Sequence, residues 1–455
     1  MPSKAATFSS RALLKQLRRF PAARRYLIGM SGGADSTALL VAMARQTDSI
    51  DASIEAVHFD HGLNSQSTSW QRHCEELCQQ LGLPLTCHSL DLSPGSPDLE
   101  NNARNQRYQW VESQIDQDTI YLTAHNADDR AETLLLNALR GSGLEGMASI
   151  PEIRPLGKGQ VARPLLGFFH EELARYLETR EITWIEDPSN QENHQDRNFI
   201  RNEIFPALEL RWPATRQSLA HTSEHLRGAN NLLRELLTQH YELSLFDQGQ
   251  LPLGILDNKD DVTATHVVRE WLRRNKAPPV PETRLLEFLD QLRASTTQSR
   301  CEMSWQGWAV RLFRGDLWLL SATNFPQCPQ MRWQGDAQLN LGPGLGTILF
   351  GKEKQNLNAK WTIGPRQPGA AVQLHPDGPD RKLKKVISEQ GVPPWQRMSV
   401  PVLYRNGSVM AIGDWQFAPI FSSWTQKHGL EYRWVPEMTE LRDTQARCLE
   451  LAVHA

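Results

Sequence analysis

The stretch SGGADS, residues 31–36, holds the residues of this 455-residue chain whose types and spacing most directly predict chemistry. It stands between an apolar run and a second apolar run of helical period. Small residues between a strand and a helix let backbone N–H groups point inward, and the helix adds the positive end of its dipole. The stretch therefore predicts an anion-binding loop suited to phosphate. Neither G-x-x-x-x-G-K-[ST] nor G-x-G-x-x-G is present, and a plain glycine turn before a capped helix stays open.

A second group of reactive side chains lies on a helix that we expect to open near Asp128. Asp129 and Glu132 are three residues apart, so they project together from that helix. A carboxylate pair of this kind can hold a lysine ammonium or a Mg²⁺ ion. Acidic residues also complement a helix dipole at its start, which is the alternative. His125, at the end of the preceding predicted strand, favours the site.

Histidine and arginine side chains extend the set. His58, Asp60 and His61 follow a predicted strand, where they could bind a transition metal or position adenosine or the loop itself. H-x-D-H lacks the helical spacing of H-E-x-x-H, so positioning is favoured over a metal site. Arg104 and Arg107 lie three apart on a predicted helix and either reach a phosphate together or form a solvated pair.

The elements that must position these residues alternate between short apolar runs and amphipathic stretches, from about residue 26 to residue 140. This alternation predicts βαβ units in an open, doubly wound parallel sheet of the α/β class. Ligands bind such sheets at the carboxyl ends of the strands, where residues 31–36, 58–61 and 125–129 fall.

The rest of the chain does not continue this alternation of strands and helices. We expect an N-terminal α/β domain at residues 1–211, a mostly helical domain at 212–330 that also contains strands, and a small α+β domain at 339–455. The acid-free basic start reads either as a helix of the fold, with Leu13 and Leu17 at helical spacing, or as a transit peptide; the helix is preferred.

Composition limits the class of protein. With 40% hydrophobic residues, a net charge of -3 and no apolar run long enough for a bilayer, the chain is typical of a soluble globular protein. Its cysteines form no C-x-x-C pair, and Cys74 with Cys78 is expected in the core. A cytoplasmic location is predicted, and neither a membrane nor a protein partner is indicated. Local basic clusters, Arg197 with Arg201 and residues 381–385, are either phosphate contacts or solvated faces.

The loop at residues 31–36 resembles the PP-loop signature, SGGxDS after a first strand, of the N-type ATP pyrophosphatases. These enzymes adenylate a carbonyl oxygen and release pyrophosphate. The resemblance implies that ATP is a substrate, with Mg²⁺ offsetting its charge through protein ligands that it leaves unknown. The residues that would bind ATP are Ser31, Gly32, Gly33, Ala34, Asp35 and Ser36.

Further motifs are similar to those of the tRNA(Ile)-lysidine synthetases, in the same order and approximate spacing. They are HFDHGLN, NARNQRY, AHNADDRAETLLLNALRGSGLEGM, RPLL and DPSNQENHQDRNFIRNEIFPAL. Residues 363–415 are also similar to the C-terminal domain of that family. The chain departs from the family pattern at Asn64, where arginine is expected, and at Ala370 to Leu374, where a Gly/Arg-rich pattern is expected.

The family resemblance implies a two-step ligation. ATP adenylates the C2 carbonyl oxygen of the wobble cytidine in a tRNA(Ile) with a CAU anticodon, and L-lysine then displaces AMP to give lysidine. Codon reading changes from AUG to AUA, and tRNA identity from methionine to isoleucine. Since the unperturbed lysine pKa is about 10.4, the attacking amine needs a proton acceptor, for which Asp35 and Asp129 both remain candidates.

The resemblance also implies roles for individual residues. Catalytic roles fall to Asp35, Asp129 and Arg104, and lysine binding to Asp129 and Glu132. The remaining candidates are nucleotide or tRNA contacts: His58, Asp60, His125, Arg107, Arg197, Arg201, Lys382, Lys384 and Lys385.

Three other functions are weighed against this one. A base-thiolating enzyme would need a catalytic cysteine or C-x-x-C pairs near the nucleotide, and a small-molecule amide synthetase would need an ammonia source such as a glutaminase domain. Neither is recognisable in the sequence. An RNA-binding protein with a relic ATPase fold would have lost Asp35 or the acids of residues 128–132, which are present.

Overall fold

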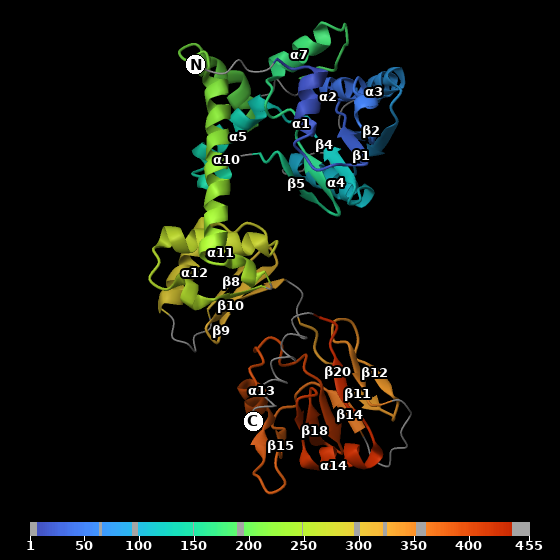
Figure 1. The fold of residues 1–455 in the computed structure, drawn as a ribbon, viewed down its shortest axis with the longest axis vertical. Coiled ribbons are helices and arrows are strands. Elements are labelled where there is room, and N and C mark those ends of the chain that lie inside the picture. The colour runs from blue at the N-terminus through green and yellow to red at the C-terminus, as the bar shows by residue number, and fades with distance from the viewer. Residues whose placement is uncertain are drawn as a thin grey trace. The chain divides into compact units, whose positions relative to one another are not determined.

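The computed structural model of the chain describes residues 7–62, 66–92, 99–148, 150–188, 195–247, 249–294, 301–321, 325–351 and 361–438 (Figure 1). The chain divides into two compact units, residues 1–236 and 237–455, and each is described by itself. Asn64 lies outside the described residues. Among the helices that are described, none is both long enough and apolar enough to cross a bilayer.

A six-stranded sheet organises the first unit, in the order β3-β2-β1-β4-β6-β5. Its strands are β1 (Arg25–Gly29), β2 (Ser53–Asp60), β3 (Leu85–Ser89), β4 (Thr119–Leu122), β5 (Ile153–Leu156) and β6 (Gly159–Ala162). All neighbouring pairs are parallel except β5 with β6, which is antiparallel. The doubly wound sheet is thereby confirmed, but the sequence pattern predicted neither β6 nor the antiparallel edge strand β5. The strand order reverses at β1, so the crevice of the sheet lies there.

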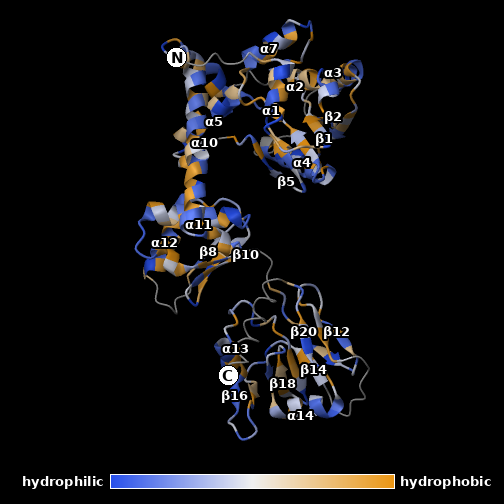
Figure 2. Ribbon diagram, viewed as in Figure 1, coloured by the Kyte–Doolittle hydropathy of each residue, from blue (hydrophilic) through white to orange (hydrophobic). Residues whose placement is uncertain are grey.

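The sheet is buried on both faces because its strands are apolar on both sides. Leu27 of β1 and Val57 of β2 belong to one core cluster, while Ile28 and Ala56, their neighbours in sequence, belong to another. Figure 2 shows these strands in the hydrophobic colours. The two clusters place a packed layer on each side of the strands that carry the loop residues.

The helices of the first unit connect and cover these strands. They are α1 (Ser10–Leu17), α2 (Ala34–Ala44), α3 (Ser67–Leu81), α4 (Leu99–Gln114), α5 (Ala127–Leu139), α6 (Leu144–Met147), α7 (His170–Glu178), α8 (Asp196–Phe199), the π-helical turn Ile200–Ile204, α9 (Phe205–Glu209) and α10 (Thr215–His240). The last of these runs into the second unit. Leu13 and Leu17 of α1 are buried in the core, which confirms that the basic N-terminal helix belongs to the fold. Helix α3 ends at Gly82, which adopts the left-handed conformation.

The second unit begins with helices packed on a small antiparallel sheet. Helices α11 (Asp261–Arg274) and α12 (Glu282–Ala294) accompany the strands β7 (Gln250–Pro252), β8 (Glu302–Trp305), β9 (Trp308–Phe313) and β10 (Asp316–Ser321), in the order β7-β10-β9-β8. The strands predicted in this stretch are confirmed as the β9–β10 hairpin.

The C-terminal part is α+β, as expected. Its strands are β11 (Met331–Trp333), β12 (Gln338–Asn340), β13 (Thr347–Leu349), β14 (Trp361–Gly364), β15 (Ala371–Val372), β16 (Arg381–Lys382), β17 (Val402–Arg405), β18 (Ser408–Ile412), β19 (Gln416–Phe417) and β20 (Arg433–Val435), with helices α13 (Leu383–Glu389) and α14 (Pro419–His428). Trp333, Trp361 and Trp434 are fully buried in its core. The division into three domains at the predicted boundaries stays a prediction.

Candidate active site

The phosphate loop, residues 31–36, joins the end of β1 to the start of α2. Gly32 adopts φ +88°, which favours glycine, and a Cβ there would lie 2.4 Å from Cδ1 of Ile185. The backbone N–H of Ile185 donates to the Gly32 carbonyl across 2.8 Å. The backbone conformation therefore favours glycine at this position, and a larger residue would also displace the Ile185 side chain.

Hydrogen bonds within the phosphate loop hold its shape. The hydroxyls of Ser31 and Ser36 lie 3.0 Å apart, and the Ser36 hydroxyl donates to the Gly33 carbonyl across 3.0 Å. Gly33 occupies the N-cap of α2 without a side-chain cap, so the first-turn N–H groups can bind an anion. The loop thus has the properties expected of a phosphate cradle.

A cleft of about 2690 Å³ opens over this loop, at the carboxyl ends of β1, β2 and β4. Ligand pockets for one small molecule are commonly about 300–1,000 Å³, so the cleft has room for a nucleotide and a further ligand. Many of the predicted site residues line it: Ser31, Gly33, Ala34, Asp35, Ser36, His58, Asp60, Arg104, Arg107, His125, Asp129 and Arg201. Gly32, Glu132 and Arg197 are not among its lining residues.

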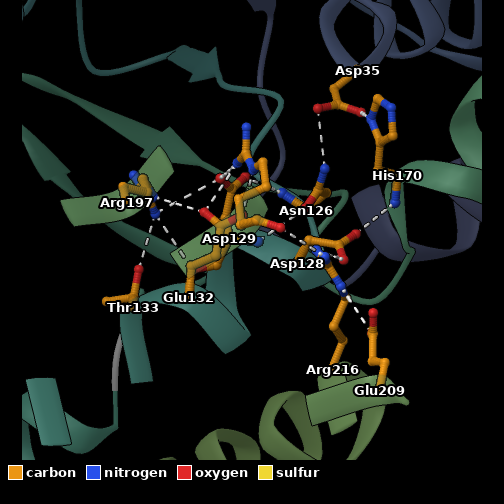
Figure 3. Close-up of polar contacts among 11 residues, drawn as sticks. Asp35, Asn126, Asp128, Asp129, Glu132, Thr133, His170, Arg197, Glu209 and Arg216 are labelled. Atoms are coloured by element: carbon orange, nitrogen blue, oxygen red, sulfur yellow. Dashed lines mark hydrogen bonds and ion pairs between the residues drawn. The ribbon is translucent and has the colours of Figure 1, made fainter. Parts of the chain in front are cut away.

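Asp35, in the first turn of α2, is held by two partners from other elements (Figure 3). Its Oδ2 accepts a hydrogen bond from Nδ2 of Asn126 across 3.0 Å, and its Oδ1 lies 2.8 Å from Nδ1 of His170. His170 is the first residue of α7. Both carboxylate oxygens of Asp35 are therefore engaged by protein groups.

Asn126 also caps α5. Its side-chain oxygen accepts from the N–H of Asp129 across 3.1 Å, and its own N–H donates to Oδ2 of Asp129 across 2.8 Å. This reciprocal pair is a capping box. Asn126 therefore hydrogen-bonds to both Asp35 and Asp129, the two carboxylates predicted from the sequence as candidate proton acceptors.

Glu132 lies fully buried beneath Asp129 and binds two arginines. Nε of Arg201 donates to it across 2.6 Å and Nε of Arg197 across 2.9 Å, and both guanidiniums also lie 3.7 Å from Oδ1 of Asp129. Asp129 and Glu132 do project together, as expected from their spacing. The structure gives Arg197 and Arg201 partners within the protein, which the sequence pattern did not indicate.

Arg197 and Arg201 come from an irregular helical segment. Arg201 lies in the π-helical turn between α8 and α9, and Arg197 lies in α8 itself. A π-helical turn shifts the register of a helix and is frequent at functional sites. Here it accompanies two guanidiniums that converge on Glu132.

Burial sets the protonation states around these groups. It raises the pKa of Asp129 to about 6, with Glu132 acting in the same direction against Arg197 and Arg201. Burial, together with the surrounding guanidiniums, lowers the pKa of His125 to about 3. His125 is therefore neutral near pH 7, while Asp129 titrates close to neutrality.

His58 and Asp60, at the end of β2, both contact backbone groups. Nδ1 of His58 lies 2.9 Å from the Met30 carbonyl, and Oδ1 of Asp60 accepts from the N–H of Gly62 across 2.8 Å. Within the described residues, no cluster of three or more His, Cys, Asp or Glu side chains could hold a metal ion. His58 thus contacts the backbone just before the phosphate loop and Asp60 the backbone just after β2, and their positioning role stays a prediction.

The cysteines of this unit are not activated. Cys74 and Cys78 are buried and free, which confirms their expected place in the core, and burial raises their pKa values to about 12 and about 11. Cys87 is exposed, and partial burial raises its pKa as well. These thiols do not provide the ready thiolate that base thiolation would need.

The second basic cluster lies in the other unit. Lys382, Lys384 and Lys385 are exposed at β16 and the start of α13, and Lys385 approaches Glu389 at 3.9 Å. Arg381 beside them pairs with Glu389. The lysines are thus available at the surface of that unit.

Comparison with known proteins decides the family. Residues 6–208 match the family model described as a PP-loop domain, residues 251–318 that of the TilS substrate binding domain, and residues 361–434 that of the TilS substrate C-terminal domain. The tRNA(Ile)-lysidine synthase of Xanthomonas campestris pv. campestris (strain 8004) is 31% identical over 90% of this chain and 94% of its own. That of Alkalilimnicola ehrlichii is 33% identical over 91% of this chain and 95% of its own.

The chain belongs to the tRNA(Ile)-lysidine synthase family. Its PP-loop domain supports the use of ATP at the phosphate loop described above. The resemblance inferred from the sequence motifs is thereby confirmed, both for the ATPase part and for the two later domains.

Asn126 and Arg216 belong to the site but were not predicted from the sequence. Asn126 follows His125 directly, and its N-x-x-D spacing to Asp129 is that of a capping box, which was a usable signal. Arg216 of α10 forms an ion pair with Asp128 at 3.2 Å and another with Glu209 at 3.0 Å. No local pattern indicates Arg216, because the pairing with Asp128 depends on the packing of distant segments.

Proposed function

We propose that this chain ligates L-lysine to C2 of the wobble cytidine of a tRNA(Ile) with a CAU anticodon, using ATP and releasing AMP and pyrophosphate. The observation that carries the proposal is the single cleft that holds both the phosphate loop and the acidic end of α5. The names of the related proteins supply the substrate class, and the cleft has room for a nucleotide beside a second ligand.

The first step forms an adenylated cytidine. ATP enters with Mg²⁺ on its phosphates, the first-turn N–H groups of α2 bind the pyrophosphate part, and the cytidine C2 oxygen attacks the α-phosphorus as pyrophosphate leaves. Arg104 lines the cleft and would offset charge that develops on the α-phosphate. Arg107, His58, Asp60 and neutral His125 line the same cleft and would contact the nucleotide.

The second step replaces AMP by lysine. The lysine ε-ammonium must lose a proton before the nitrogen attacks C2, and Asp129 is the proton acceptor that we favour because its pKa is near neutrality. Asp35 is the weaker candidate, since both of its oxygens already bind Asn126 and His170. Glu132, which the resemblance assigned to lysine binding, is fully buried and held by Arg197 and Arg201, so we propose that it acts through Asp129 and not by contacting lysine.

One reconstitution tests the activity. The full chain is incubated with ATP, labelled lysine and a tRNA(Ile) transcript bearing CAU, and label in the tRNA and released pyrophosphate are counted. We expect incorporation only when all three substrates are present, with one pyrophosphate released per lysine. A transcript with another anticodon is the control. No label in the CAU transcript would refute the proposal.

Contacts with tRNA phosphates are assigned to Lys382, Lys384 and Lys385, and to the exposed parts of Arg197 and Arg201. Each lost phosphate contact lowers the salt slope of binding by about 0.7–0.9, so replacing the three lysines by alanine should lower it by roughly 2. Lys427→Ala, which removes an exposed cation from α14, is the control. An unchanged slope in the triple variant would remove these lysines from the interface.

A further inference from the structure

Asp35 places a negative charge close to where the phosphates of ATP would bind. Its carboxylate lies in the first turn of α2 and lines the cleft beside the N–H groups that would bind pyrophosphate. A triphosphate carries several negative charges, and a carboxylate beside it is repulsive unless a cation is placed between or behind them. The loop supplies backbone dipoles and hydroxyls but no cationic side chain, because it contains no lysine or arginine, so a protein cation here would act in addition to the Mg²⁺ that accompanies ATP.

His170 lies where a positive charge would offset that of Asp35 (Figure 3). Its Nδ1 lies 2.8 Å from Oδ1 of Asp35, and its backbone N–H donates to Oδ2 of Asp128 across 2.9 Å. Helix α7, which begins at His170, packs against α2, which carries Asp35. His170 is therefore held once through its ring and once through its backbone, yet 55% of its side chain is exposed and it lines the cleft.

We propose that His170 is a further residue of the ATP site, which as an imidazolium offsets the charge of Asp35 and donates its Nε2–H to the phosphate groups of ATP. The inference rests on the proposed function for the assignment of the phosphate loop to ATP. Sequence motifs gave no indication of it, since His170 lies 135 residues from Asp35.

The charges that face His170 favour its protonated form. Asp35 of α2 and Asp128 of α5 are acidic, whereas Arg201 of the π-helical turn opposes them. The hydrogen bond to Asp35 raises the pKa of His170 above its ordinary value, against the effect of burial. On α7 itself, Glu171 and Glu172 follow and also line the cleft. A bound triphosphate adds negative charge and favours the imidazolium further.

His170 could act as a phosphate-binding cation or as a general base, and the two roles predict different effects of pH on ATP affinity and on the rate of the lysine step. If His170 binds phosphate as a cation, ATP binds more weakly as pH rises through the pKa of His170. If it instead accepted a proton from lysine, the rate of the lysine step would rise over the same range and ATP affinity would be unaffected. The position of the ring against the phosphate loop favours the cation.

Calorimetric titration of the full chain with Mg·ATP between pH 6 and pH 9 tests this inference. For the wild type, we expect the Kd to rise with pH, and proton uptake on binding when the imidazole starts out partly neutral. His170→Gln should bind ATP roughly tenfold more weakly at pH 6, the size expected for loss of a charge-assisted hydrogen bond at a half-exposed site. His170→Arg should bind tightly across the range without proton uptake.

Two controls accompany these variants. His221→Gln, an exposed histidine of α10 outside the cleft lining, should retain the wild-type pH profile, and thermal unfolding should confirm that every variant is folded. Wild-type affinity and pH dependence in His170→Gln would overturn the inference. Lysine incorporation is measured in parallel, so failure of the proposed function would be seen as missing label in the wild type, whatever the titrations show.

Discussion

The side-chain amide of Asn126 donates to Asp35 across 3.0 Å and so connects the first turn of α5 to the phosphate loop, 91 residues earlier in the chain. The same asparagine caps α5 through Asp129. Asp35 and Asp129 therefore share one hydrogen-bonding partner, which lies between the proposed ATP and lysine subsites.

This connection predicts different effects for two replacements of Asn126. Asn126→Asp keeps an oxygen to cap α5 but loses the amide donor and sets a second carboxylate against Asp35. We expect pyrophosphate release to fall at least about tenfold, and thermal stability to fall as well, because the added carboxylate is buried beside Asp35 and Asp129. Asn126→Ala loses the cap as well and should lose about 1 kcal/mol of unfolding free energy. Urea unfolding and a pyrophosphate assay separate these effects; equal activity in Asn126→Asp and wild type would contradict them.

The raised pKa of Asp129 predicts the pH dependence of the lysine step. A general base works in its ionised form, so the single-turnover rate should rise with pH through about 6 and then level off. Asp129→Asn should lose this rise and be slower by roughly 10²–10⁴-fold, while pyrophosphate release in the first step persists. Asp35→Asn is the comparison and should keep the rise with pH, because Asp35 is the weaker candidate for the base. A rise through pH 6 that survives in Asp129→Asn would assign the proton to another group.

The buried cluster around Glu132 predicts a large loss of stability. Glu132→Ala leaves Arg197 and Arg201 facing each other without the carboxylate, and breaking a buried ion pair costs about 3–5 kcal/mol. Because the guanidiniums are each 36% exposed, we expect the lower end of that range or somewhat less. Asp196→Asn, which breaks an exposed pair with Arg140, should cost below about 1 kcal/mol. Similar losses in urea unfolding for both variants would contradict the view that Glu132 is a buried anchor.

The sequence predicted those parts of the site that lie within one motif or at one strand end. Residues 31–36 were recognisable because strand, glycines and helix are contiguous, and Asp129 with Glu132 because a helix repeats every three to four residues. Burial of α1 was likewise indicated by the spacing of Leu13 and Leu17.

Contacts between distant segments were not predictable in this way. His170 meets Asp35 only because α7 packs on α2, and Arg216 meets Asp128 only because α10 returns to the start of α5. The edge strand β5 was missed because it is four residues long and lacks a clear alternation. Arg197 and Arg201 were predicted as phosphate contacts or a solvated face, and their pairing with Glu132 was not predicted because Glu132 lies more than 60 residues away.

The packing of Ile185 on the phosphate loop predicts how that loop tolerates a side chain. Gly32→Ala places a Cβ 2.4 Å from Cδ1 of Ile185 and also strains the backbone, so both ATP affinity and stability should fall. Gly141→Ala has a similar positive φ with no atom within 4 Å, and should show only the conformational cost of about 1–2 kcal/mol. Ile185→Val removes Cδ1, so the double variant with Gly32→Ala should recover stability toward the Gly141→Ala value. Stability is measured by urea unfolding and ATP affinity by titration. If the double variant does not recover, the backbone conformation alone would explain why position 32 is a glycine.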